Sequence, residues 1–469
     1  MLLKSRSSQP VVFHRAEPDN LYNTNMRYFY TFLFSFFLFT APLGAEIISP
    51  LQGTPDQTGQ ALHKAGAAVE LSGKLTLEDC LSLAKANSPQ AVSAQLSLQN
   101  AQVSLNLAKA EFLPTATAGA SQGYNNNKTD GFPRTDHGSS NVYAQAQLSI
   151  SGITDIARSI KVKRLALEQA ELNVQQVEND LLRTVKKNYY ALLSATRAVN
   201  IRTKSRDLYK DQYERAAEYY RQGLRPKVDV TTAEVNLNNE ELRLIRAKNL
   251  VKTASAQLAN TLGITASNTL EIEDIADFAP FGLSFEEAVH QAYETRPDVL
   301  SSQTGVRISQ IQLNQAKAGF FPTFSFSAGF SKSGDDFYLD NEETKLLASV
   351  EIPLFNAFKT YNNVKQAKLS LEGTLNDNRN LLNNVFLEVQ SAYIKMQESQ
   401  ESIPIAELNV QKAKENLDLA QGRYNEGIGD VIALKDAEVA YTDAELSLLT
   451  ARYDYASAVA DLKQAMGTN

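Results

Sequence analysis

The sequence predicts a mainly α-helical, internally duplicated protomer with a β-barrel part, to which it contributes four strands. A short phrase that changes from helical to alternating sequence occurs twice, at 108–115 and at 316–323. After each phrase two kinds of side chain alternate, as they do in a strand with two different faces. Very long stretches with the apolar spacing of a coiled coil then follow. These three observations favour an elongated protomer over a globular domain.

The composition argues against several classes of function. The chain has 469 residues, of which 21% are charged, and its net charge of -7 gives no basic surface for nucleic acid. The single cysteine, Cys80, excludes an intramolecular disulfide and a cysteine zinc cluster. The four histidines are scattered without the spacing of metal ligands. We therefore expect no metal, no cofactor and no nucleic-acid partner.

Residues 1–45 are interpreted as a secretory signal peptide. An intensely apolar run at 29–40 is too short for a transmembrane helix, and a small residue, Ala45, stands at the expected cleavage point. Met26 is an alternative start of the chain, and a buried core helix is the competing interpretation of the run. Residues 46–73 are rich in Gly, Thr, Gln and Pro, and we expect them to form a flexible leader.

Two segments, 74–263 and 283–469, follow the same plan. Each is expected to open with a short capped helix, and a second helix then begins at a proline. Pro114 and Pro322 end these second helices, because proline cannot continue a helix and disfavours the helical conformation of the residue before it. Two strands, a very long helix, a glycine turn and a return helix complete each plan. The acidic, proline-interrupted residues 264–282 are interpreted as a linker or equatorial segment.

Each segment is expected to carry one β-hairpin, at about 115–151 and about 323–354, with polar loops at 121–140 and 331–343. Strands with one apolar and one polar face suit a barrel with an apolar exterior and a wet interior, not a parallel sheet buried on both sides. Four strands are too few to close a barrel, so the sequence also predicts an oligomer. The side chains expected to face lipid are Val142, Ala144, Ala146, Leu148, Phe324, Phe326, Leu346 and Val350.

The first very long helix is predicted from about Thr154 to Gln222, a span of roughly 100 Å at the rise of an α-helix. Its apolar residues are spaced alternately by three and four positions, as in a coiled-coil seam. A globular core is not that deep, so such helices must pack side by side. The seam residues are Leu167, Ala170, Val174, Val177 and Leu181, and the counterparts in the second segment include Leu382, Val385, Val389 and Ala392.

This ordered set of features resembles the TolC-like family of outer-membrane efflux and secretion channels. The resemblance covers about residues 75–467 and rests on the signal peptide, the paired helix openings, the repeated phrase with its proline, Tyr189, Tyr393 and the two glycine turns. It implies a homotrimer in which each protomer adds four strands to a twelve-stranded outer-membrane β-barrel. It also implies that the long helices form a periplasmic α-barrel.

The resemblance implies a passive exit duct of a tripartite efflux or type I secretion system. Such a duct is coupled through a periplasmic adaptor, or membrane fusion protein, to an inner-membrane pump of the RND, ABC or MFS type. A periplasmic coiled-coil scaffold or adaptor is the alternative, but it does not explain the alternating strands. No phosphate-binding loop, nucleophile elbow or zinc-protease motif indicates an enzyme. The carboxylate pair Asp335–Asp336 is interpreted as a solvated pair in a loop.

The resemblance implies that the two glycine turns are tips that dock the adaptor. Glycine at such a turn also has a purely structural role, because it supplies the left-handed residue that ends a helix. The two roles do not exclude one another. The tip residues are Gly223 and Leu224 in the first turn and Gly427, Ile428 and Gly429 in the second.

A periplasmic gate is expected just beyond the tips. The resemblance assigns it Asp229 and Asp436, with Asp430 as a third candidate that could instead cap a helix. Three-fold symmetry would turn each carboxylate into a ring, and a ring of like charges attracts cations and repels anions. The competing interpretation is that these are ordinary solvated carboxylates near helix ends.

Overall fold

The computed structural model describes residues 74–127, 130–131, 135–265, 269–275, 280–334, 341–426, 428 and 431–468. All of them belong to one unit of the chain, Ala65–Asn469. Several features predicted from the sequence lie outside the described residues. These are the signal peptide, the leader, the pair Asp335–Asp336, and Gly427, Gly429 and Asp430 of the second glycine turn.

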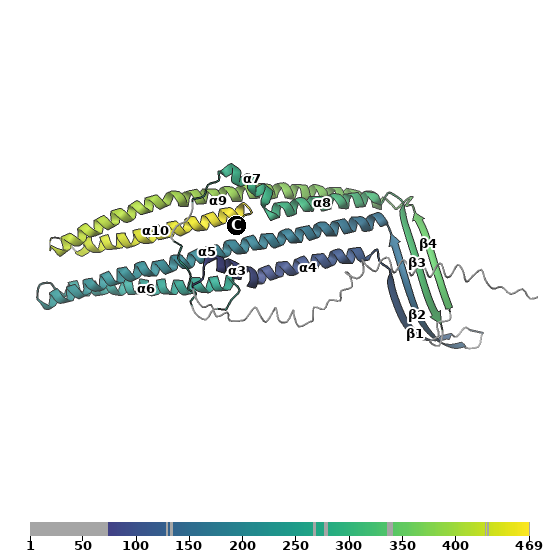
Figure 1. Ribbon diagram of the computed structural model, residues 1–469, viewed down its shortest axis with the longest axis horizontal. Helices are drawn as coiled ribbons and strands as arrows, with labels where there is room; N and C mark the ends of the chain where they lie inside the picture. Colours follow the sequence, from purple (N-terminus) through teal and green to yellow (C-terminus); the bar gives the residue numbers. More distant parts are fainter. Residues whose placement is uncertain are drawn as a thin grey trace, which may run out of the picture. The chain divides into compact units, whose positions relative to one another are not determined.

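The described elements follow the same order in both copies of the plan (Figure 1). Two helices lead into a hairpin, and a very long helix then runs to a turn from which a shorter helix returns. The first copy contains α3 (Leu77–Asn87), α4 (Pro89–Ala110), β1 (Thr115–Asn127), β2 (Thr135–Ser151), α5 (Ile153–Arg221) and α6 (Lys227–Thr261). The second contains α7 (Phe285–Thr295), α8 (Pro297–Ala318), β3 (Thr323–Gly334), β4 (Asn341–Glu351), α9 (Lys359–Asn425) and α10 (Val431–Ala465).

The expected caps of the two opening helices are confirmed. The Thr76 side chain accepts a hydrogen bond from the Asp79 backbone N–H at 3.1 Å, and the Asp79 carboxylate accepts one from the Thr76 N–H at 3.0 Å. Ser284 and Glu287 form the same reciprocal pair at the start of α7, at 3.3 and 2.9 Å. Each capping box satisfies two N–H groups that the first helical turn leaves without partners.

The four strands form one antiparallel sheet in the order β1-β2-β3-β4. Cross-strand partners share a face, and Ala146 of β2 stands opposite Ala116 of β1 and Phe330 of β3. The same register continues to β4, where Val350 stands opposite Phe324. The eight side chains predicted to face one way therefore do share a face. The strands β1 and β4 are the two edges of the sheet.

The hairpins differ from the prediction at both ends. The strands continue further toward their connections than expected, since β1 reaches Asn127 and β2 begins at Thr135, inside the segment interpreted as a loop. Cross-strand pairing of polar residues overrides their preference for turns. At the other end β4 stops at Glu351, three residues early. Pro353, which cannot donate to a strand ladder, stands two residues further on.

Two apolar cores lie in the helical part. The first is built mainly from the first copy but includes Leu449 and Tyr453 of α10, and the second is built from the second copy. The first surrounds Tyr189 of α5, and the second surrounds Val385 and Val389 of α9. The linker passes over the first core. Its residue Ile272 forms a parallel bridge with Leu75, before α3.

Tyr189 fastens this linker to α5. Its hydroxyl donates to the carbonyl of Glu273 at 2.7 Å, and its ring is fully buried. Two turns further along α5, Arg197 forms a bidentate ion pair with Asp274 at 2.8 Å. The corresponding tyrosine of the second copy, Tyr393, lies 3.4 Å from the carbonyl of Leu283, a longer and more exposed contact. The two copies therefore share the position of this tyrosine but not the strength of its contact.

A glycine ends the return helix of each copy and packs against the start of that copy. Gly263 and Gly467 have φ values of 69° and 77°, in the left-handed region. A Cβ atom at Gly263 would lie 2.5 Å from the carbonyl oxygen of Asn87, and one at Gly467 would lie 2.8 Å from the Cα of Arg296. Only glycine fits both the backbone conformation and the close approach.

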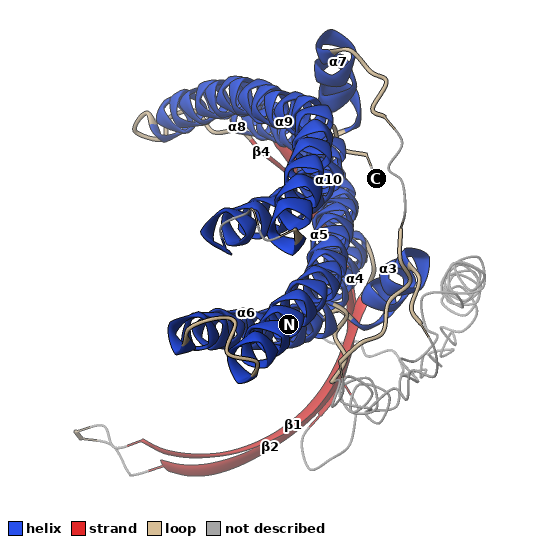
Figure 2. Ribbon diagram, turned by 90° about the vertical axis from the view of Figure 1, so that its left-hand side faces the viewer, coloured by secondary structure: helices blue, strands red, loops and turns tan. Residues whose placement is uncertain are grey.

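Seen from the end of the helices that lies away from the sheet, the helices of this unit lie along an arc, and β1 and β2 curve as well (Figure 2). Neighbouring helices pack side by side along the arc, with α6 on α5 and α10 on both α9 and α5. No helix in the described part of the chain combines the length and apolar character needed to cross a membrane.

Candidate functional site

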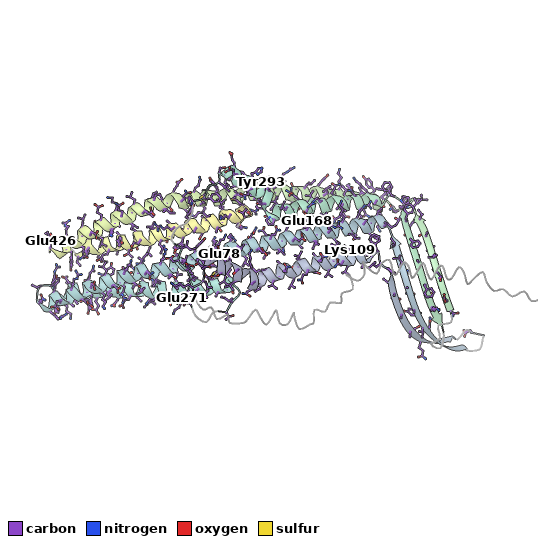
Figure 3. The ribbon with its side chains drawn as sticks, viewed as in Figure 1. Glu78, Lys109, Glu168, Glu271, Tyr293 and Glu426 are labelled. Atoms are coloured by element: carbon purple, nitrogen blue, oxygen red, sulfur yellow. The ribbon has the colours of Figure 1, made fainter. Side chains whose placement is uncertain are left out.

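The two glycine turns lie at the same end of the helical part, away from the sheet. The pairs α5–α6 and α9–α10 are antiparallel hairpins, and Figure 3 labels Glu426 at their end and Lys109 close to the sheet. The sequence separates the two turns by about 200 residues, and only the duplicated plan brings them to one end. We call the residues of the two turns the hairpin ends.

The first hairpin end is a Schellman motif. The Leu224 N–H donates to the Tyr219 carbonyl at 2.9 Å, and the Gly223 N–H donates to the Tyr220 carbonyl at 2.9 Å. Gly223 has a φ of 75°, and no atom lies within 4 Å of the place where its Cβ would be. Leu224 is 67% exposed. The turn thus combines a left-handed glycine, open space and an exposed apolar side chain.

The second hairpin end closes in the same way where it is described. The Ile428 N–H donates to the Arg423 carbonyl at 3.1 Å. This is the bond of a Schellman motif that joins residues five positions apart. Ile428 is 71% exposed, matching Leu224 in the first turn. Each hairpin end therefore presents one exposed aliphatic residue directly after its glycine position.

Asp229 lies in the first turn of α6 and is tied to the hairpin end. Its carboxylate stands 3.5 Å from the Arg225 guanidinium, which also lies over the ring of Tyr424, 5.8 Å from its centre. Tyr424 belongs to α9, so Arg225 links the two hairpin ends through a cation–π contact. Arg225 and Tyr424 were not among the residues predicted for this site. An arginine and an aromatic residue at the matching turns were the available signal.

Asp436 lies in the second turn of α10 and is exposed. Among the described residues it forms no ion pair, and it makes no hydrogen bond to Asp229. The structure therefore does not join these two predicted gate residues within one protomer. A shared role would need them to approach one another in an assembly.

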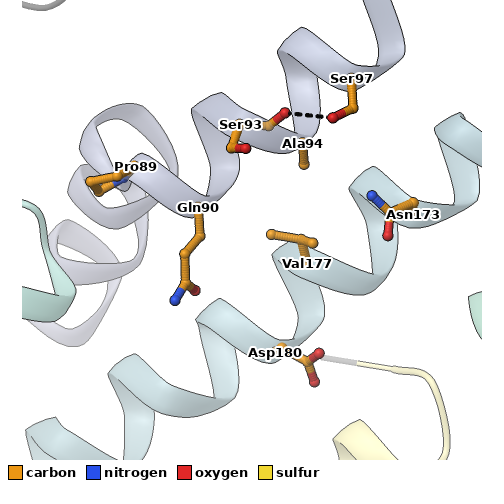
Figure 4. Close-up of a pocket in the computed structure, with 8 residues that line it drawn as sticks. All are labelled: Pro89, Gln90, Ser93, Ala94, Ser97, Asn173, Val177 and Asp180. Carbon is orange, nitrogen blue, oxygen red and sulfur yellow. Dashed lines mark hydrogen bonds between the residues drawn. The ribbon is translucent and has the colours of Figure 1, made fainter. Parts of the chain in front are cut away.

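A recess in the half of the helical part nearer the sheet offers no group of charged side chains like that at the hairpin ends. It has a volume of about 450 Å³ and lies between α4 and α5 (Figure 4). Asp180 is the one ionisable side chain of its lining, and it already accepts hydrogen bonds from Gln176 and Gln464. The lining residues are Pro89, Gln90, Ser93, Ala94, Ser97, Asn173, Val177 and Asp180.

Comparison with known proteins decides the family. The sequence profile of the family described as outer membrane efflux protein matches residues 80–264 and again 288–468. The chain belongs to the outer membrane efflux protein family. The two matched segments coincide with the two copies of the plan, and the linker lies between them. The members of this family are channel proteins, and this outer membrane efflux protein is a channel of the outer membrane with its helical part in the periplasm.

Its relatives among known proteins are distant in sequence but similar over most of their length. It is 22% identical over 407 residues to the outer membrane protein TolC of Vibrio cholerae, covering 84% of this chain and 90% of the relative. It is 21% identical over 370 residues to the cation efflux system protein CusC of Escherichia coli, covering 77% and 79%. The alkaline protease secretion protein AprF of Pseudomonas aeruginosa is 24% identical over 298 residues, covering 61% of this chain and 60% of the relative.

Solved structures share the fold. The CmeC outer membrane channel of Campylobacter jejuni superposes with a TM-score of 0.73 at 17% identity, covering 86% of this chain and 91% of that one. The MtrE outer membrane channel of Neisseria gonorrhoeae gives a TM-score of 0.70 at 19% identity, covering 84% and 89%. The expected fold class, with a duplicated protomer and four antiparallel strands, is confirmed.

Proposed function

We propose that three copies of this chain form one channel, with a twelve-stranded barrel in the outer membrane and a helical tunnel in the periplasm. The observation that carries the proposal is the open sheet: β1 and β4 each have one partner in the described chain, so their outer edges need other strands. A barrel satisfies both edges, and the curvature of the sheet suits closure. The apolar face that includes Phe324 and Val350 would then meet lipid.

We propose that the hairpin ends are the periplasmic entrance of this tunnel and the docking surface for an adaptor. Leu224 and Ile428 are exposed aliphatic side chains next to positions without bulk, and another protein's backbone could approach there closely. The adaptor would couple the channel to an inner-membrane pump of the RND, ABC or MFS type. The channel itself would be a passive conduit and not an enzyme. Asp229 and Asp436 would line its entrance.

Bulky residues at the hairpin ends test the docking role. Gly223→Trp combined with Gly427→Trp should abolish export while trimers still reach the outer membrane, because the indoles occupy the space that the adaptor needs. Gly131→Trp is the matched control, since Gly131 also has a positive φ of 93° and open surroundings, but lies in the β1–β2 connection. Export and membrane-fraction trimers should be measured together. Normal export by the double variant would remove the hairpin ends from the docking model.

A further inference from the structure

Two glutamates in the helical hairpins α5–α6 and α9–α10 are buried as completely as the apolar core residues. Glu240 of α6 is 1% exposed, and Glu438 of α10 is 2% exposed. A buried carboxylate is unfavourable unless ion pairs or hydrogen bonds compensate for its lost hydration. The two residues differ in how far this compensation goes.

Glu240 is fully compensated by arginines of its own hairpin. Its Oε1 lies 3.2 Å from a guanidinium nitrogen of Arg202 on α5, and its Oε2 lies 3.1 Å from one of Arg243 on α6. Both oxygens therefore have a charged donor. These three residues fasten α5 to α6, and the Glu240 carboxylate itself has partners only in the first hairpin.

Glu438 has no such compensation. Its Oε1 accepts a hydrogen bond from the Gln212 side-chain amide of α5, and no described residue donates to its Oε2. Burial is the main cause that raises the pKa of the Glu438 carboxyl to about 7, and the bond from Gln212 lowers it only in part. A neutral carboxyl group needs no counterion, so the protonated form fits this environment.

Glu438 lies where a change in its protonation would affect the contact between the two helical hairpins. Gln212 belongs to the first hairpin and Glu438 to the second, so their contact lies in the seam between α5 and α10. Glu438 is about two turns from the start of α10, close to the entrance. The buried residues in these stretches of the two helices are Leu434, Ala437 and Thr442 on α10 and Ser205, Tyr209 and Ala216 on α5.

We propose that Glu438 is a proton-operated latch between the two hairpins. Protonated, it stays in the seam and holds α10 against α5. When it loses its proton, the buried charge favours separation of the hairpins and opens the entrance. This latch rests on the proposed function, in which the hairpin ends form that entrance.

The surrounding charges leave Glu438 without a counterion. From α5, Arg202 faces Glu240 and stands 4.0 Å from Asp443 of α10, so its charge is already engaged. From α6, Arg243 is engaged by Glu240. From α9, Asp418 faces the neighbouring part of α10 around Tyr441 and adds negative charge only.

Tyr209 completes the surroundings of the latch. Burial first, and then the carboxylates of Glu438 and Glu240, raise the pKa of the Tyr209 hydroxyl, so it remains neutral across the working range of the latch. Tyr209 therefore does not compete with Glu438 as the titrating group of this seam.

The direction of the pH dependence follows from the raised pKa. With the hairpins together, Glu438 binds its proton up to about pH 7, whereas a solvated glutamate releases it near 4.5. The closed arrangement therefore binds more protons, and its advantage over the open one falls as pH rises through this window. Each pH unit in the window shifts the equilibrium of one protomer by up to about tenfold toward the open form.

Distance measurement between spin labels tests the latch in the assembled full-length protein. The labels are placed at Leu224→Cys and Ile428→Cys, both exposed, in protein reconstituted into lipid nanodiscs. The native Cys80 does not compete for the label, because its side chain is fully buried and burial raises the pKa of its thiol to about 11. We expect a longer distance between the hairpin ends at pH 9 than at pH 5, with the change falling between about pH 4.5 and pH 7.

Two variants identify the responsible carboxyl. Glu438→Gln keeps the shape and the Gln212 contact but cannot ionise, so the ends should stay together throughout this pH range. Glu240→Gln removes an equally buried carboxyl and should keep the change in distance. An unchanged distance in the wild type, or the same change in Glu438→Gln, would overturn the latch. Conductance of the same proteins in planar bilayers at one pH separately tests the channel, so failure of the latch and failure of the proposed function are distinguishable.

Discussion

At the scale of single residues, Arg225 joins the two hairpin ends, because its guanidinium pairs with Asp229 on α6 and lies over the ring of Tyr424 on α9. Gly223 could be recognised because a helix followed by glycine is a common ending, and its left-handed φ agrees. Arg225 could not be assigned, because its two partners, Asp229 and Tyr424, lie on different hairpins. Glu438 could not be singled out either, because its partner Gln212 lies on the other hairpin. Nothing in a helix sequence says that one glutamate is exposed and another is buried against a helix over 200 residues away in the chain.

The charges at the entrance lead to a prediction on ion selectivity. Replacing Asp229→Asn together with Asp436→Asn removes two carboxylates from each protomer, so the proposed rings lose their attraction for cations. We expect the reversal potential in a salt gradient to move toward zero, and block by multivalent cations from the periplasmic side to weaken. Planar-bilayer recordings measure both quantities.

Glu286→Gln is the control for this experiment, because Glu286 is an exposed carboxylate in the first turn of α7, away from the hairpin ends. It should leave selectivity as in the wild type. Equal reversal potentials in the wild type and the double variant would exclude Asp229 and Asp436 from the gate.

At the scale of elements, periodicity predicted the helices and the faces of the strands closely. The long helix expected from about Thr154 to Gln222 runs from Ile153 to Arg221. Its ends were predictable because a glycine precedes it and a glycine turn follows it. The ends of the strands were not, because polar residues near Asn127 and Thr135 pair only with one another across the hairpin. Pairing of that kind has no periodic signal in the sequence.

The two faces of β2 can be distinguished by matched substitutions. Ala146 is on the face shared with Phe330, whereas its neighbour Gln147 is on the opposite face. An arginine in mid-membrane on a lipid-facing strand position costs roughly 2–4 kcal/mol, so Ala146→Arg should reduce the yield of assembled barrels. Gln147→Arg should be tolerated, because this side chain would face the water-filled interior of the proposed barrel. Heat-modifiable migration on gels reports the assembled fraction, and equal losses for both variants would mean that the faces are assigned wrongly.

At the scale of the whole molecule, the duplication organises everything else. Each copy contributes one hairpin to the sheet, one pair of long helices and one hairpin end, and each closes on itself through a glycine packed on its own beginning. The sequence revealed this plan because prolines and glycines recur at nearly constant separation. It also indicated an oligomer, because four strands cannot close a barrel. The number of copies followed only from the family resemblance, since no residue pattern counts subunits.

Crosslinking between the sheet edges tests the trimeric barrel most directly. The full-length protein would carry Ala118→Cys on β1, combined in turn with a cysteine at Thr344, Leu346 or Ala348 on β4, all positions of one face. Within one chain these edges are separated by two other strands, so a short thiol crosslinker would join them only between copies. We predict that at least one pair gives covalent dimers and trimers on a denaturing gel, with no larger species. Products that stop at the monomer for every pair, or that extend beyond three chains, would contradict the account.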